Sequence, residues 1–163
     1  MPDFPVPDLD GQAARLIATL TRRGETVAAA ESLTAGLVCA TLARIPGASA
    51  VLRGGLVVYA TELKHVLAGV DEELLAARGA VDPEVAAQLA AGARDRCGAT
   101  WGLGLTGVAG PSAQDGVAPG TVHLGLCGPS GQTVRTLVLT GDRDAVRTGS
   151  VSAAFTLLEE QLD

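Results

Sequence analysis

The stretch TVAAAESLTAGLVCATLARI, residues 26–45, decides the fold class because its pattern changes within a few residues. Its first five residues form a short apolar run, which is typical of a buried strand. ESLTAG follows as a turn, and LVCATLARI then spaces its apolar residues as a helix does, until Pro46-Gly47 ends it. The stretch therefore predicts a strand, a turn and a helix, the unit from which α/β proteins are built.

The sequence on either side supplies further helices and strands. Helices are predicted at 9–23, 71–78, from Asp82 onward and at 143–162 behind an Asp142 cap, with a short helix or turn at 61–70. Strands are predicted at 54–60, 101–107, 121–128 and 133–141, the last two as a hairpin around Pro129-Ser130-Gly131. We therefore expect an α/β fold: a three-layer α/β/α sandwich with a mixed, mostly parallel sheet of about five strands.

Length and composition bound the organisation of the chain. Its 163 residues fit one domain, which we place at 9–163 after a loose lead at 1–8. No run reaches the roughly 18 apolar residues that a membrane span needs. The first residues, MPDFPVPDLDG, carry prolines and acids where a signal peptide has a basic and then an apolar stretch. We expect a cytoplasmic protein with no membrane partner.

Charge and cysteine usage argue against two further kinds of partner. The formal net charge is −6, and no basic run offsets it, so no nucleic-acid partner is expected. Cys39, Cys97 and Cys127 are far apart and form no CxxC pair, which fits reduced thiols better than a zinc site. Only His65 and His123 could add ligands, so we expect neither a metal nor a cofactor.

Ser32 lies where the first predicted strand gives way to a helix. Free backbone N–H groups at such a helix start can bind an anion or an oxyanion, so this is a good position for a nucleophile. The alternative is that Ser32 or Thr34 only caps the helix. Neither His65 nor His123 has an orienting acid nearby in the sequence, so an activated Ser32 would need another base.

Lys64 is the only lysine in a chain that otherwise uses arginine as its cation. A lysine that is desolvated in a site can lose its proton and act as a base, which arginine cannot do. We predict that Lys64 points inward toward Ser32, that Glu62 faces solvent, and that the Tyr59 hydroxyl reaches the amine or the substrate. The alternatives are a lysine on a solvated helix face and a tyrosine in ordinary packing.

Two further patterns could contact a ligand. GLGLTG at 102–107 matches the dinucleotide fingerprint, but no helix can follow it, so we reject that reading and keep Thr106, Gly107 and Gly110 as a loop that a ligand can approach. A glycine-rich connector without a ligand is equally compatible. Arg143 and Arg147 lie one helical turn apart and could grip a phosphate, or form surface salt bridges instead.

Several of these segments together resemble a known family. They are AESLTAGLV (30–38), IPGAS (45–49), GGLVVYATELKHVLAGV (54–70), GLTGVAGP (104–111), PGTVHLGL (119–126) and GDRDAVR (141–147). Taken in this order along residues 10–162, these segments are similar to the C-terminal domain of the CinA family, the nicotinamide mononucleotide deamidases. The resemblance implies a homo-oligomer that hydrolyses the carboxamide of a pyridine mononucleotide, its small-molecule substrate, to nicotinate mononucleotide and ammonia.

The resemblance also implies roles for individual residues. Ser32 would be the nucleophile, Lys64 its base, and Tyr59 a neighbour of both. The expected ligand or oxyanion contacts are Thr34, Ala35, Gly36, Gly47, Thr106, Gly107, Gly110, Arg143 and Arg147. The chain departs from the family pattern at residues 60–64, which lack an asparagine, and at 110–114, which hold fewer glycines. A non-catalytic nucleotide-binding or protein-interaction module of the same fold is the alternative function.

Overall fold

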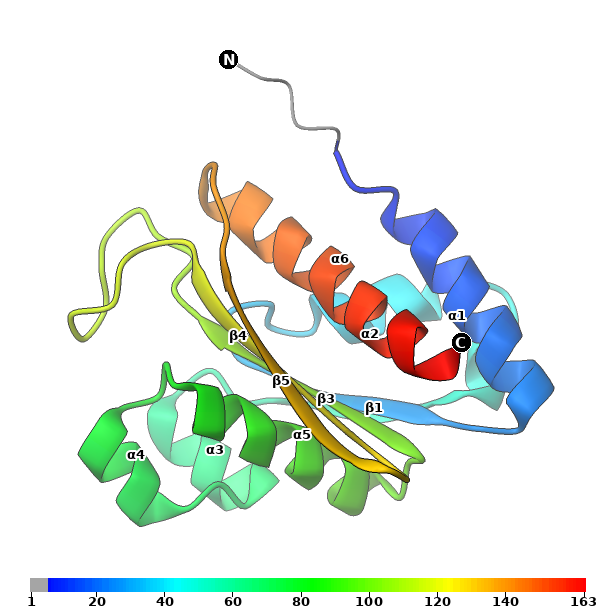
Figure 1. The fold of residues 1–163 in the computed structure, drawn as a ribbon, viewed down its shortest axis with the longest axis horizontal. Helices are drawn as coiled ribbons and strands as arrows, with labels where there is room; N and C mark the ends of the chain where they lie inside the picture. The colour runs from blue at the N-terminus through cyan, green and yellow to red at the C-terminus, as the bar shows by residue number, and fades with distance from the viewer. Residues whose placement is uncertain (1–5) are drawn as a thin grey trace.

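The computed structural model describes residues 6–163, and Figure 1 shows their arrangement. The elements are α1 (Leu9–Arg23), β1 (Val27–Glu31), α2 (Leu37–Ala43), a 3-10 turn η1 (Ala48–Ala50), β2 (Leu52–Val57), α3 (Thr61–Ala68), α4 (Glu72–Arg78), α5 (Pro83–Cys97), β3 (Trp101–Gly107), β4 (Thr121–Gly128), β5 (Gly131–Val138) and α6 (Arg143–Leu162).

The strands form one sheet in the order β2-β1-β3-β4-β5. β1 pairs in parallel with β2 and β3, while β4 pairs antiparallel with β3 and β5. Four of the five strands consequently point the same way, with β4 reversed. The predicted mixed, mostly parallel sheet is confirmed.

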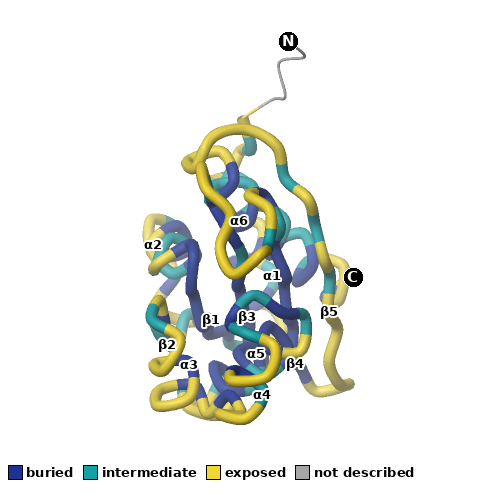
Figure 2. The backbone as a smooth tube through the Cα atoms, turned by 90° about the vertical axis from the view of Figure 1, so that its left-hand side faces the viewer, coloured by how far each residue is buried: buried dark blue, intermediate teal, exposed yellow. Residues whose placement is uncertain are grey.

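Helices cover both faces of this sheet. Figure 1 shows α1, α2 and α6 on one side and α3, α4 and α5 on the other. Successive side chains of β1 point to opposite faces of the sheet, each of which has its own hydrophobic core. Val27 and Ala29 pack under α1 and α6, whereas Ala28 and Ala30 face α5. Figure 2 shows the central strands buried, whereas β5 at the edge is largely exposed. The predicted three-layer α/β/α sandwich is therefore confirmed.

Glycines in the central strands let α5 lie directly on the sheet. A Cβ at Gly102 would collide with the Ala90 carbonyl, and a Cβ at Gly125 with the Ala86 carbonyl. The first two glycines of GLGLTG, Gly102 and Gly104, thus serve helix-on-sheet packing, a use that was not predicted from the sequence.

Helix starts follow the sequence closely. The side chains of Asp82 and Asp142 accept hydrogen bonds from Glu84 N and Ala145 N, as capping residues do. Asp8 caps α1 in the same way, accepting from Gly11 N at 3.0 Å. Asp8, which was predicted to belong to the loose lead at 1–8, is therefore fixed to the start of α1, while residues 1–5 of that lead lie outside the described part of the chain.

The second strand is shifted from its predicted place. It spans Leu52–Val57 rather than 54–60. The neighbouring β1 ends at Glu31, which pairs with Val57, so the ladder has no further partner beyond one last bond from Val58 N to Glu31 O. Tyr59 and Ala60 therefore leave the sheet.

Candidate functional site

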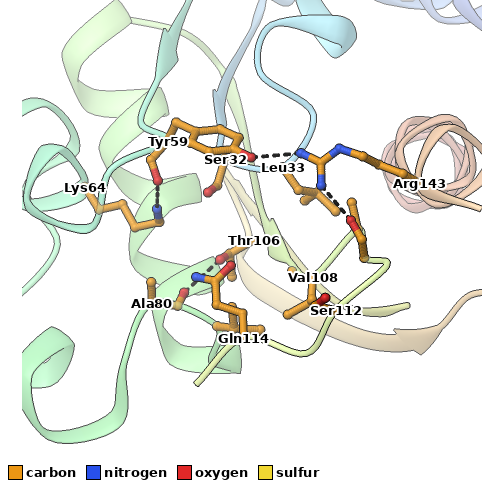
Figure 3. Close-up of a pocket in the computed structure, with 14 residues that line it drawn as sticks. Ser32, Leu33, Tyr59, Lys64, Ala80, Thr106, Val108, Ser112, Gln114 and Arg143 are labelled. Atoms are coloured by element: carbon orange, nitrogen blue, oxygen red, sulfur yellow. Dashed lines mark hydrogen bonds between the residues drawn. The ribbon is translucent and has the colours of Figure 1, made fainter. Parts of the chain in front are cut away.

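A pocket lies at the carboxyl ends of the three parallel strands. Ser32 follows β1, Tyr59 follows β2, and Thr106 and Gly107 end β3. This is the edge at which open α/β sheets usually bind ligands. The pocket, drawn in Figure 3, is lined by Ser32, Leu33, Tyr59, Lys64, Ala80, Val81, Thr106, Gly107, Val108, Ala109, Gly110, Ser112, Gln114 and Arg143.

Ser32 is not the cap of the helix that follows it. A four-residue turn, 33–36, separates it from α2, whose first N–H groups are bound by the buried Glu31 carboxylate: Val38 N donates to Oε1 at 2.8 Å and Cys39 N to Oε2 at 3.2 Å. Among the described residues, the Ser32 hydroxyl makes no hydrogen bond to any protein group. The capping alternative is therefore wrong for Ser32, and its hydroxyl is free for another use.

The turn after Ser32 has an unusual backbone. Ala35 and Gly36 both have positive φ, 48° and 99°, a conformation that glycine adopts freely but alanine rarely does. Ala35 N donates to Ser32 O and Leu37 N donates to Thr34 O, each at 3.0 Å. Thr34 is fully buried, and its hydroxyl has no partner among the described residues, so it does not cap α2 either.

Lys64 projects from α3 into the pocket and is almost completely buried, at 1% exposure. Its Nζ donates to the backbone carbonyls of Val58 at 2.7 Å and Tyr59 at 3.1 Å. Burial lowers its pKa from 10.5 to about 8, and the charge of Glu62 raises it only in part. Glu62 is exposed and forms no ion pair with Lys64, as predicted.

Figure 3 shows the Ser32 hydroxyl and the Lys64 amine facing the same pocket. A neutral amine has two N–H donors and one lone pair. In that form the two carbonyls can take both donors, and the lone pair is left to accept a proton. The contacts of Lys64 are therefore compatible with the predicted role of a base.

Tyr59 connects to a different residue than predicted. Its hydroxyl accepts a hydrogen bond from Arg143 at 3.0 Å, while only its backbone carbonyl meets the lysine. Of the two predicted partners of the Tyr59 hydroxyl, the Lys64 amine is therefore wrong, because Tyr59 has left the sheet and is 56% exposed, whereas contact with the substrate stays a prediction. Arg143 also donates to Gly110 O at 2.7 Å and so joins both sides of the pocket mouth.

Thr106 and Gly107 form the floor between these groups. The buried Thr106 hydroxyl donates to Ala80 O at 2.7 Å, which ties the end of β3 to the segment before α5. Gly107 allows β4 to pass close by, since a Cβ there would meet the Thr121 carbonyl at 2.6 Å. Both residues still present atoms to the pocket.

The structure brings together most of the predicted residues and leaves some apart. Ser32, Tyr59, Lys64, Thr106, Gly107, Gly110 and Arg143 line the pocket, whereas Thr34, Ala35, Gly36, Gly47 and Arg147 do not. Arg147 instead donates from Nε to Leu33 O at 2.9 Å and from its terminal nitrogen to Thr34 O at 3.0 Å. Gly47 caps η1, away from the pocket.

Sequence reasoning missed two polar residues of the pocket, Ser112 and Gln114. Both lie in the loop 108–120, where a backbone pair between Gln114 and Val117 closes a tight turn through Asp115-Gly116. The Asp-Gly turn signal was present in the sequence. It could have shown that the loop folds back on itself and presents side chains rather than only backbone.

Both histidines have structural partners outside the pocket. His65 bonds Val70 O and His123 bonds the Thr136 hydroxyl, so neither faces Ser32. Burial lowers the pKa of His123 and raises that of the Cys39 thiol to about 12. Within residues 6–163 no cluster of three metal-ligating side chains occurs, and no helix has the length and apolarity to cross a membrane.

The fold and this pocket define an α/β protein with a serine and a buried lysine at the carboxyl edge of its sheet. The chain belongs to the CinA family, since residues 10–162 match the model of the CinA C-terminal domain. A CinA-like protein of Frankia casuarinae is 50% identical over 147 residues, which are 90% of this chain and 34% of the relative. The CinA-like protein of Gloeobacter violaceus is 42% identical, covering 95% of this chain and 37% of its own length.

Solved structures agree with this placement. The competence/damage inducible protein CihA from Agrobacterium tumefaciens has 33% identity and a TM-score of 0.92, with both chains fully covered. A CinA superfamily protein from Klebsiella pneumoniae has 28% identity and a TM-score of 0.92, covering 96% of this chain and 98% of that one. This chain thus spans about a third of the length of the two CinA-like relatives. It spans all or nearly all of the length of the two solved chains.

Proposed function

We propose that the protein hydrolyses the carboxamide of nicotinamide mononucleotide, giving nicotinate mononucleotide and ammonia. The observation that carries the proposal is the buried Lys64 amine, which pairs with no carboxylate among residues 6–163 and faces the pocket that also holds Ser32, a serine that caps no helix. The substrate itself follows from the resemblance to the family. A cytoplasmic location and a homo-oligomeric state belong to the same proposal.

In the first half of the reaction, Ser32 Oγ attacks the carboxamide carbon while Lys64 takes the hydroxyl proton. Lys64 then delivers this proton to the amide nitrogen, the C–N bond breaks, and ammonia leaves an ester on Ser32. Gly107 lines the pocket, whereas residues 34–36 do not. Gly107 is therefore better placed to stabilise the oxyanion.

In the second half, water attacks the ester carbon and Lys64 accepts its proton. Returning the proton to Ser32 Oγ releases the carboxylate product, so the net consumption is one water per ammonia. Arg143, at the pocket mouth, is held by Tyr59 and Gly110, and it is the cation that would bind the phosphate with the N–H donors that these two bonds leave free.

The test is ammonia release from purified protein with nicotinamide mononucleotide, nicotinamide riboside and free nicotinamide. We expect turnover of the mononucleotide, much less of the two compounds without phosphate, and none with the Ser32→Ala variant. Tight binding of the mononucleotide with no ammonia release would support the non-catalytic nucleotide-binding module instead.

A further inference from the structure

Arg143 and Arg147 lie one turn apart on α6, yet their guanidinium groups do different things. Arg143 is exposed and reaches across the pocket mouth. Arg147 is half-buried, lines no part of the pocket, and donates to the consecutive backbone carbonyls of Leu33 and Thr34 at 2.9 and 3.0 Å. Two of its five N–H donors thus bind the segment that follows Ser32, and they fix the guanidinium against that segment rather than in the pocket.

That segment needs outside support. The turn at 32–36 is not helical, and two of its residues have positive φ. Internal bonds hold it only through Ala35 N and Leu37 N. Among residues 6–163, the Leu33 carbonyl accepts a hydrogen bond only from Arg147.

The turn is held at both ends by charged groups. The Glu31 carboxylate, just before Ser32, binds two N–H groups of α2, while the Arg147 guanidinium binds two carbonyls just after it. Hydrogen bonds from charged groups are stronger than neutral ones, and a planar guanidinium with two parallel donors fixes direction as well as distance. Ser32 lies between these two anchors.

We propose that Arg147 is a positioning residue for the Ser32 turn and not a ligand of the substrate phosphate. It acts through the backbone of Leu33 and Thr34, and so sets the direction of the Ser32 hydroxyl toward the pocket. Arg143 alone of the pair then contacts the phosphate. The kinetic part of this inference rests on the proposed function, whereas the structural part does not.

The kinetic test compares matched variants: Arg147→Ala and Arg147→Lys against Arg143→Ala and Arg143→Lys. We expect the Arg147 variants to lose about 10- to 100-fold in kcat with KM within about threefold, because small misplacements of a reacting group are costly. Arg147→Lys keeps the charge but cannot provide two parallel donors, so it should rescue little. A raised KM with unchanged kcat would make Arg147 a substrate ligand and overturn the inference.

A second measurement does not need turnover. Amide hydrogen exchange, followed by mass spectrometry, should be faster across residues 32–38 in Arg147→Ala than in the wild type or Arg143→Ala, with the central strands unchanged. Equal exchange at 32–38 would overturn the inference. If the wild type released no ammonia at all, the proposed function would fail, and the exchange result alone would decide whether Arg147 holds the turn.

Discussion

Two walls of the pocket, the Ser32 turn and the loop 108–120, are built in opposite ways. The turn is mostly buried, and Glu31 and Arg147 tie it to α2 and α6. The loop is exposed from Pro111 to Gly116, and its outer part is held mainly by Arg143 and by its own Gln114–Val117 pair. Under the proposed function, we expect the turn and Lys64 to set the chemistry and the loop to adjust what is bound.

The sharpest test of this comparison is Ser32→Ala. It should lower ammonia release by at least about 10³-fold, as expected for loss of a nucleophile. Because Ser32 makes no cap, the free energy of unfolding should change by less than about 1 kcal/mol. Glu31→Gln is the matched control and should lose about 1.5 kcal/mol or more, since it weakens a buried charge-assisted cap. Denaturant unfolding of both variants measures this contrast.

Lys64→Arg should be the next most damaging change. It keeps a charge but removes the ability to accept a proton, so we expect a loss of about 10²- to 10⁴-fold in kcat. In the wild type, kcat/KM should rise with pH and level off above about 8, the lowered pKa of Lys64, because only the neutral amine is active. Substantial turnover by Lys64→Arg, or a pH profile flat from 6 to 9, would rule out the lysine as base.

The same lysine should affect stability with a defined sign. Folding lowers its pKa from 10.5 to about 8, so between these values the unfolded chain binds more protons than the folded one. Stability attributable to Lys64 therefore rises with pH through this range and is lowest below about pH 8, where both states are protonated. The difference in unfolding free energy between the wild type and Lys64→Met, measured from pH 7 to 10.5, should show this rise, because the opposite effect of the Cys39 thiol, whose pKa is raised from 9.0 to about 12, is common to both proteins.

Arg143→Ala addresses the mouth of the pocket, where the two walls meet. Loss of a charge-assisted contact should raise KM for the mononucleotide by about 10- to 100-fold, or about 1.5–3 kcal/mol, with kcat changed less. Tyr59→Phe removes one of the two groups that hold Arg143 and should raise KM in the same direction but less. An unchanged KM in Arg143→Ala would remove this arginine from the site.

The smallest effect is expected at the loop itself. Gln114→Ala removes a neutral amide that lines the pocket from an exposed turn, so KM should change by about 2- to 10-fold and stability by less than about 0.5 kcal/mol. Comparing KM for several pyridine nucleotides would show whether the loop selects among them. A loss of kcat as large as that of Lys64→Arg would mean that the loop, too, belongs to the chemistry.

Much of the fold followed from local patterns. Caps such as Asp82 and Asp142, and the hairpin around Pro129-Ser130, were readable because capping and tight turns depend on a few adjacent residues. The end of β2 was missed because its length depends on where β1 stops, a pairing between segments far apart in the chain. Ser32, Lys64 and Thr106 were predicted to lie in the site and do line the pocket, whereas Ser112 and Gln114, which also line it, were missed.

The sequence by itself determined the layered α/β class, the helix ends, and the presence of a single lysine near the end of a strand, since periodicity and residue chemistry are local properties. Only the tertiary structure decided which groups that chemistry meets. It put the Tyr59 hydroxyl on Arg143 rather than on Lys64, gave the cap of α2 to Glu31 instead of Ser32, and engaged Arg147 with the turn. These contacts join side chains and backbone groups from elements that are far apart in the chain. The spacing of residues within one segment therefore cannot predict them.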